Sequence, residues 1–131
     1  MKVLCASDKA SSFDERHLRL GYTRRSELAL KEGKEYRVYG IAAWQQVWMV
    51  LVFDEDDLPS WYPLDLFSVT DPSLPSDWFF STLVSQPTTI SAIFGYAELV
   101  MDPAHYDGIV EREQEALRLI RQRRAASEEG H

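Results

Sequence analysis

Positive charge is missing from more than half of this sequence. Residues 38–111 contain no Lys or Arg, although they hold 11 carboxylates and 13 of the 16 aromatic residues, including all four Trp. At average usage a segment of this length carries on the order of nine basic residues. The chain has a net charge of −7, so we expect it to repel polyanions. This excludes a general affinity for nucleic acid or anionic lipid and favours a basic partner.

Cysteine is scarce, and long apolar runs are absent. The single cysteine, Cys5, cannot form an intramolecular disulfide, which fits a reducing compartment. The longest apolar run, Val47–Phe53, is too short to span a bilayer. The apolar run at the N-terminus is too short for a signal peptide. We therefore expect a cytoplasmic protein with no membrane partner.

Motifs that carry catalysis or bind cofactors are also absent. His17, His105 and His131 are scattered, and none has a second histidine at metal-binding spacing. There is no nucleophile elbow, phosphate-binding loop or dinucleotide fingerprint. The acidic run Asp54–Asp57 does not fit a calcium loop, because Leu58 occupies a ligand position and the turn glycine is missing. The sequence therefore predicts no catalytic residue, no metal site and no cofactor.

The composition that is present predicts one folded domain. Hydrophobic residues make up 45% of 131 residues, which is enough for a real core. Residues 1–53 carry nine basic and six acidic groups, residues 54–107 carry none and ten, and residues 108–131 carry five and five. No linker separates these zones. We expect a single domain over residues 1–126 and a frayed tail over residues 127–131.

The middle of the chain has the pattern of an antiparallel hairpin. Glu35–Ala43 and Gln46–Phe53 are rich in β-branched and aromatic residues and are separated by a short link. The second of these strands is apolar on both faces, which is typical of a strand covered on both sides. We expect it at the centre of the sheet.

The remaining elements are predicted from turn and propensity signals. We expect a loop over Asp54–Pro59, a short edge strand over Trp61–Val69 interrupted at Pro63, and a strand over Ile90–Met101 with a glycine at its middle. Two patterns compete in Ser76–Leu83, because its first two residues could cap a short helix whereas the aromatic run over 78–80 favours a strand, and we favour a turn with brief helical character. Shorter strands are expected over 17–22 and 27–30.

The C-terminal segment has the signals of an amphipathic helix. Asp102 is a good N-cap, and Pro103 stands at the first helical position. Apolar residues then recur at helical spacing as far as Ile120. Together these elements predict an α+β fold, mainly antiparallel, with a strongly bent sheet or partly open barrel of about five or six strands and one C-terminal amphipathic helix.

The candidate binding residues are acids and aromatics at the turns of the basic-free segment. Apolar anchors ringed by one sign of charge are typical of a steered protein interface. The alternative is that the aromatics are core and the acids are solvated turns. The candidate partner-binding residues are Asp54, Glu55, Asp56, Asp57, Trp61, Tyr62, Asp65, Asp71, Asp77 and Trp78.

One stretch of the chain resembles a known class of proteins. Residues 33–41 (GKEYRVYGI), the apolar strand and acidic loop that follow, and residues 61–67 (WYPLDLF) are similar to small bacterial proteins with SH3-like barrels. Some of these proteins are immunity proteins against toxins. The resemblance covers roughly residues 30–80. It implies a non-enzymatic inhibitor that covers the basic active site of a toxin, often one that acts on nucleic acid.

Three functional hypotheses follow. The first is an immunity or antitoxin protein whose acidic loops bind a basic toxin domain, with a nuclease as the candidate toxin. The second is a homodimerising interaction or scaffold module that pairs its basic N-terminal zone with the acidic zone of another copy. The third is a small hydrolase that uses loop carboxylates.

Overall fold

The described strands form two antiparallel sheets. The computed structural model describes residues 1–7, 28–44, 47–82 and 90–129. Within these residues the larger sheet has the order β5-β4-β3-β8-β7 and the smaller sheet has the order β2-β1-β6. The strands of the larger sheet are β3 (Gly40–Trp44), β4 (Val47–Phe53), β5 (Pro59–Pro63), β7 (Phe79–Thr82) and β8 (Ile90–Gly95). Those of the smaller sheet are β1 (Lys2–Cys5), β2 (Glu35–Arg37) and β6 (Phe67–Asp71).

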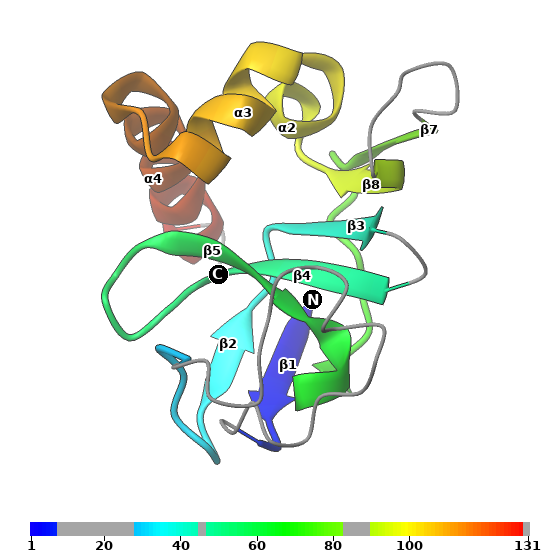
Figure 1. Ribbon diagram of the computed structural model, residues 1–131, viewed down its shortest axis with the longest axis vertical. Helices are drawn as coiled ribbons and strands as arrows, with labels where there is room; N and C mark the ends of the chain where they lie inside the picture. Colours follow the sequence, from blue (N-terminus) through cyan, green and yellow to red (C-terminus); the bar gives the residue numbers. More distant parts are fainter. Residues whose placement is uncertain (8–27, 45–46, 83–89, 130–131) are drawn as a thin grey trace.

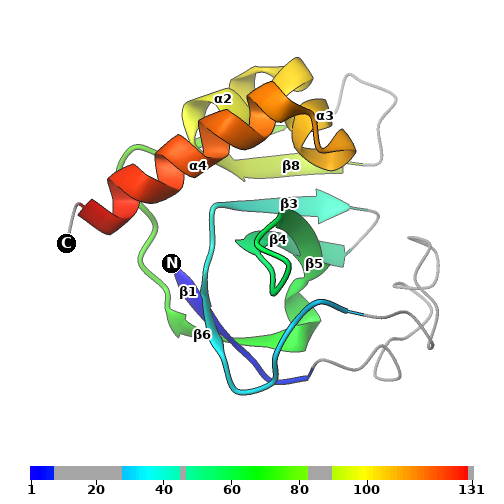
Figure 2. The same cartoon turned by 90° about the vertical axis from the view of Figure 1, so that its left-hand side faces the viewer.

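Three α-helices complete the described part of the chain. They are α2 (Ala97–Met101), α3 (Pro103–Glu111) and α4 (Gln114–Glu129). The helices lie on one side of the molecule and the smaller sheet lies on the other, with the strands of the larger sheet between them (Figure 1 and Figure 2). The fold is α+β, as predicted, but the described strands form two sheets that do not close into a barrel.

The predicted first strand of the hairpin is divided between the sheets. Residues 35–37 belong to the smaller sheet and residues 40–44 to the larger one. Between them the N–H of Val38 donates to the Met1 carbonyl at 2.9 Å, and the N–H of Tyr39 donates to the Leu51 carbonyl at 2.8 Å. Two neighbouring residues thus bond to different sheets, and the chain crosses from one layer to the other at this point.

The predicted strand over Trp61–Val69 is divided in the same way. It is interrupted after Pro63 by a short 3₁₀ helix, η2 (Leu64–Leu66). The part before the break is β5, which is an edge strand as predicted, and the part after it is β6 in the smaller sheet. The interruption at a proline was predicted, whereas the change of sheet was not.

Strand β4 has the two buried faces that its sequence predicts. Met49 and Leu51 belong to the core cluster that includes helical residues. Val50 and Val52 belong to the cluster that includes the smaller sheet. The strand is therefore interior, and the β3–β4 hairpin is confirmed by its antiparallel register. The central strand of the larger sheet is β3 rather than β4.

The predicted strand over Ile90–Met101 ends early. Strand β8 stops at Gly95, which is paired with Gly40 of β3. A Cβ atom on Gly40 or Gly95 would lie 2.5 or 2.7 Å from Cδ2 of Leu99. The two glycines therefore let helix α2 pack directly on the strand backbones, and the second half of the predicted strand is this helix.

The predicted C-terminal helix is two helices. Asp102 caps α3, because its carboxylate accepts the N–H of Ala104 at 3.0 Å, and Pro103 occupies the first position. The helix ends at Arg112, which has a left-handed backbone with φ of 60°. Helix α4 then packs closely on α3, since a Cβ on Gly108 would lie 2.8 Å from Cβ of Ala116.

The smaller predictions have different outcomes. Residues 76–77 form a turn, but the strand β7 begins at Phe79, so the predicted helical character is wrong. The predicted strand over 17–22 lies outside the described residues, and the described part of the strand predicted over 27–30, residues 28–30, is not a strand. Of the predicted link at residues 44–45, Trp44 is the last residue of β3 and residue 45 lies outside the described residues. The division into a domain over residues 1–126 and a tail stays a prediction, with α4 extending to Glu129.

Candidate interaction site

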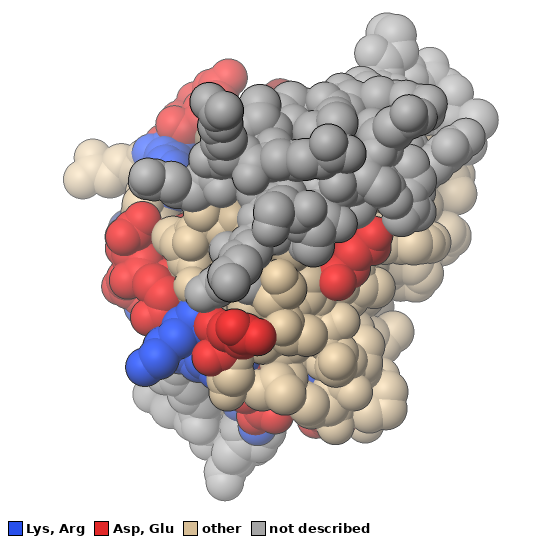
Figure 3. Space-filling model, turned by 60° about the horizontal axis from the view of Figure 1, so that its bottom comes forward, with Lys and Arg blue, Asp and Glu red and all other residues tan. Residues whose placement is uncertain are grey.

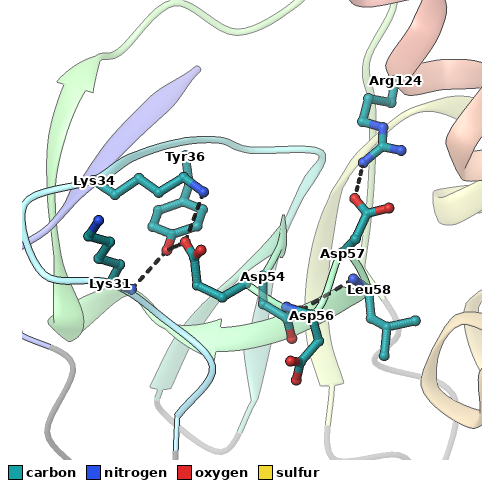
Figure 4. A network of polar contacts seen from close by, with 9 residues as sticks. Lys31, Lys34, Tyr36, Asp54, Asp56, Asp57, Leu58 and Arg124 are labelled. Carbon is teal, nitrogen blue, oxygen red and sulfur yellow. Dashed lines mark hydrogen bonds and ion pairs between the residues drawn. The ribbon is translucent and has the colours of Figure 1, made fainter.

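The acidic turn after β4 is organised by one buried carboxylate. Asp54 is only 7% exposed. Its Oδ1 accepts the N–H of Asp56 at 2.9 Å and the N–H of Leu58 at 3.2 Å. Its Oδ2 accepts the hydroxyls of Ser60 and Tyr62, each at 3.0 Å. Figure 4 shows this carboxylate inside the turn. Asp54 therefore shapes the turn from inside.

The second acid of the turn is held by one residue of β2 and one residue just before it. Glu55 accepts a hydrogen bond from the phenolic hydroxyl of Tyr36 at 2.6 Å and pairs with the Lys34 ammonium at 2.8 Å. Two hydrogen bonds hold the pKa of Glu55 below its usual value, and the one from Lys34 has a larger effect than the one from Tyr36. Tyr36 in turn accepts the N–H of Lys31 at 2.9 Å. The carboxylate thus links the turn to the smaller sheet.

The last acid of the turn binds helix α4. Asp57 has a left-handed backbone with φ of 57°. Its carboxylate accepts a hydrogen bond from the guanidinium of Arg124 at 2.7 Å, and this bond lowers the pKa of Asp57. The same guanidinium lies 4.0 Å from the centroid of the Phe53 ring, and Arg121 donates to the Asp57 carbonyl at 3.3 Å. Two arginines of α4 are therefore docked on the acidic turn.

The other predicted acids are Asp56 of the same turn and three acids on other segments of the chain. Asp65 is exposed on η2, and Asp71 accepts the N–H of Ser73 at 3.0 Å, which lowers its pKa. Asp56 and Asp77 are exposed, and within the described residues their carboxylates have no hydrogen bond or ion pair. Figure 3 shows acidic side chains in several separate groups on one face.

Two of the predicted aromatic anchors belong to the core. Trp61 is 8% exposed and packs against the rings of Trp44 and Tyr106. Tyr62 is 7% exposed and bonds to Asp54. Trp78 is partly buried against the cluster that includes the smaller sheet. The alternative interpretation, in which the aromatics are core residues, describes Trp61 and Tyr62 as they lie in the structure.

Sequence reasoning missed an exposed apolar surface around β7. Leu74, Phe79 and Phe80 are 48%, 44% and 54% exposed, and Asp77 is the one charged residue in positions 72–82. We call these four residues the β7 surface. A signal was present in the sequence, because adjacent residues of a strand point to opposite faces of a sheet. An edge strand with two adjacent phenylalanines cannot easily bury both.

The described histidine lies inside the helical layer. His105 is 6% exposed, and its Nε2 lies 2.6 Å from the hydroxyl of Tyr96. Burial lowers the pKa of His105 and raises that of Tyr96. The tyrosine hydroxyl therefore stays protonated and can donate a hydrogen bond to the neutral ring. Burial by itself would raise the pKa of nearby Glu98. The carboxylate accepts two hydrogen bonds from Arg123, at 2.6 and 2.7 Å, and these outweigh the effect of burial and lower the pKa of Glu98. This cluster connects α2, α3 and α4.

Comparisons with protein-family models, with curated proteins and with solved structures found no match. In the part of the chain that the structure describes, no three His, Cys, Asp or Glu side chains are grouped so that they could hold a metal ion. No helix among the same residues is long and apolar enough to cross a membrane.

Proposed function

We propose that this chain is a non-enzymatic cytoplasmic protein that binds a basic protein partner, in the manner of immunity or antitoxin proteins. The partner would be a toxin domain, and a nuclease is the strongest candidate because its active site must attract a polyanion. The resemblance of residues 30–80 to small SH3-like immunity proteins supports this class. The observation that carries the proposal is the β7 surface.

The β7 surface combines the two features that such an interface needs. Large apolar side chains that stay in water are typical of binding sites, because their burial by a partner is favourable. Three of them are close to half exposed here, in the segment that carries Asp77 and no positive charge. A net charge of −7 would speed the approach of a basic partner and repel acidic ones.

Inhibition of toxin nucleases tests this proposal. The probes are purified nuclease-toxin domains with an isoelectric point above about 9, and the readout is their rate of DNA cleavage as the chain is added. We expect stoichiometric inhibition of at least one domain. The inhibition should weaken as NaCl rises from about 50 to about 500 mM, because salt screens exposed charges.

A matched pair of charge reversals sharpens the experiment. Asp77→Lys should weaken the inhibition by about tenfold, because it puts a cation into the contact. Glu111→Lys makes the same change of charge at an exposed position at the end of α3, and should leave the inhibition unchanged. Failure to inhibit any domain, or inhibition that ignores both salt and Asp77→Lys, would overturn the proposal.

A further inference from the structure

We propose that the partner binds by adding an extended strand to the free edge of β7. The inference depends on the proposed function for the basic character of the partner. Strand β7 is the last strand of the larger sheet, and within the described residues only β8 pairs with it. Figure 1 shows β7 at the periphery, beyond β8. An edge strand presents unpaired N–H and C=O groups on which another chain can form a ladder.

A row of apolar side chains crosses the larger sheet and ends at this edge. The register places Phe80 opposite Phe94, and the two rings are 4.4 Å apart between centroids. Moving away from the edge, the row continues through Phe94, Ile41, Val50 and Tyr62. Val50 is fully buried, whereas Phe80 is 54% exposed. An added strand would extend the row and cover Phe80 with its own apolar residue.

The opposite face of the same edge offers a second apolar contact. Phe79 is paired with Gly95, and Leu99 of α2 packs on that glycine. Phe79 therefore lies on the helical face of the sheet, while Phe80 lies on the other face. An added strand with apolar residues at adjacent positions could contact one phenylalanine on each face.

The charges around the edge favour a basic strand. Strand β7 itself has no charged residue, and Asp77 stands two positions before it, exposed and without an ion pair among the described residues. Arg37 and Arg123 border the cavity beside Asp77. Both are only partly exposed, and Arg123 is already bound to Glu98. On the segment that carries β7, positions 72–82, the one charge is therefore negative.

Short synthetic peptides test the mode of binding without a natural partner. The probe is a fluorescently labelled peptide in which adjacent valine and phenylalanine residues are flanked by lysines, and the readout is anisotropy as the chain is added. Two matched peptides serve as controls. One replaces every lysine with glutamate, and the other carries a methyl group on every backbone amide, which removes the donors of a ladder. We expect binding of the lysine peptide and a loss of about tenfold or more with each control.

A pair of aromatic replacements locates the site on the chain. Phe80→Lys places a positive charge on the edge, which is how natural proteins block strand addition, and should abolish binding of the lysine peptide. Trp48→Lys changes another exposed aromatic, 47% exposed on β4, and should leave binding unchanged. If Phe80→Lys unfolds the chain, Thr82→Lys, at an exposed position of the same strand, replaces it.

Four results would overturn the inference. They are equal binding of the glutamate peptide, equal binding of the methylated peptide, equal effects of Phe80→Lys and Trp48→Lys, and a dimer in sedimentation that Phe80→Lys dissociates. The last result would assign the edge to a second copy. The proposed function fails separately: if the peptide binds at β7 and no basic nuclease is inhibited, strand addition stands and the toxin assignment falls.

Discussion

At the scale of single residues, Asp54 illustrates why charge alone does not identify a binding residue. Its carboxylate accepts four hydrogen bonds inside the turn after β4. A carboxylate that is buried must be satisfied in this way, because desolvation without partners is costly. The neighbouring Asp56 has the same chemistry in the sequence and is exposed. The difference is one of position within the turn.

Replacement of Asp54 should therefore cost far more stability than replacement of Asp56. Asp54→Ala leaves two backbone donors and two hydroxyls without their acceptor, and we expect the free energy of unfolding to fall by about 3 kcal/mol. Asp56→Ala, the control, should change it by less than about 0.5 kcal/mol. Urea denaturation followed by tryptophan fluorescence measures both. Similar losses for the two variants would contradict the assigned role of Asp54.

His105 should make the stability of the protein depend on pH. Burial lowers its pKa in the folded state from the ordinary value of 6.5, although the carboxylates of Asp102 and Glu98 oppose the shift. Just below pH 6.5 the unfolded chain therefore binds more protons than the folded one. The stability due to neutral His105 is complete above this pH, declines as the pH falls, and stops declining below the folded pKa.

The test compares the wild type with His105→Gln by urea denaturation between about pH 5 and pH 7.5. The free energy of unfolding of the wild type should decline more steeply with falling pH than that of the variant, which has no imidazole to protonate. Parallel pH profiles of the two proteins would show that His105 does not titrate differently in the folded and unfolded states.

At the scale of elements, local chemistry predicted much of the fold. The β3–β4 hairpin, the loop after it, the edge strand β5 and the cap at Asp102 all follow from neighbouring residues. The divisions between sheets at Val38 and at η2 do not, because the bonds that place each half are made to distant segments. The end of α3 at Arg112 has no strong local signal either. It depends on the packing of α4 against Gly108.

The candidate site was predictable to a similar extent. The sequence located the acidic turn at Asp54–Asp57, since adjacent like charges and Pro59 cannot continue a strand. It could not tell that Asp57 binds Arg124, because 67 residues separate them. It also could not tell that Phe79 and Phe80 stay exposed, because that depends on which strand forms the edge of the sheet.

The glycine pair predicts a packing defect that depends on Leu99. Gly40→Ala would place its Cβ 2.5 Å from Leu99 Cδ2, and we expect a loss of about 1–3 kcal/mol in the free energy of unfolding from overpacking. In a chain that already carries Leu99→Ala, the same replacement should cost much less. A double-mutant cycle by urea denaturation measures this coupling. Additive effects would indicate that Leu99 does not pack on the glycines.

Arg124 should stabilise the docking of α4 on the acidic turn both by its charge and by the contact of its guanidinium with an aromatic ring. Asp57 is 68% exposed at its side chain, so the ion pair itself should contribute about 0.5 kcal/mol. Arg124→Ala also loses the contact with the Phe53 ring and should cost about 1 kcal/mol. Arg124→Lys should recover only part of this, because lysine lacks the planar group. Full recovery by lysine would assign the effect to charge only.

At the scale of the whole molecule, the charge zones complement one another. Three of the ion pairs join an acid of the basic-free segment to a basic residue outside it: Lys34–Glu55, Arg123–Glu98 and Arg124–Asp57. Part of the excess of acidic residues in the basic-free segment therefore stabilises the fold, because it attaches the turn before β2 and helix α4 to the middle of the chain. The part that remains for a partner is smaller and includes Asp77 of the β7 surface.

A basic partner that binds along the edge of β7 should protect the backbone amides of that strand, and hydrogen exchange measures this protection. The measurement compares amide exchange of the chain alone and in complex with a basic nuclease domain that it inhibits. We expect slower exchange at residues 79–82 in the complex and unchanged exchange at exposed positions of α4. Protection confined to α4 or to the turn at Asp54–Leu58 would contradict it.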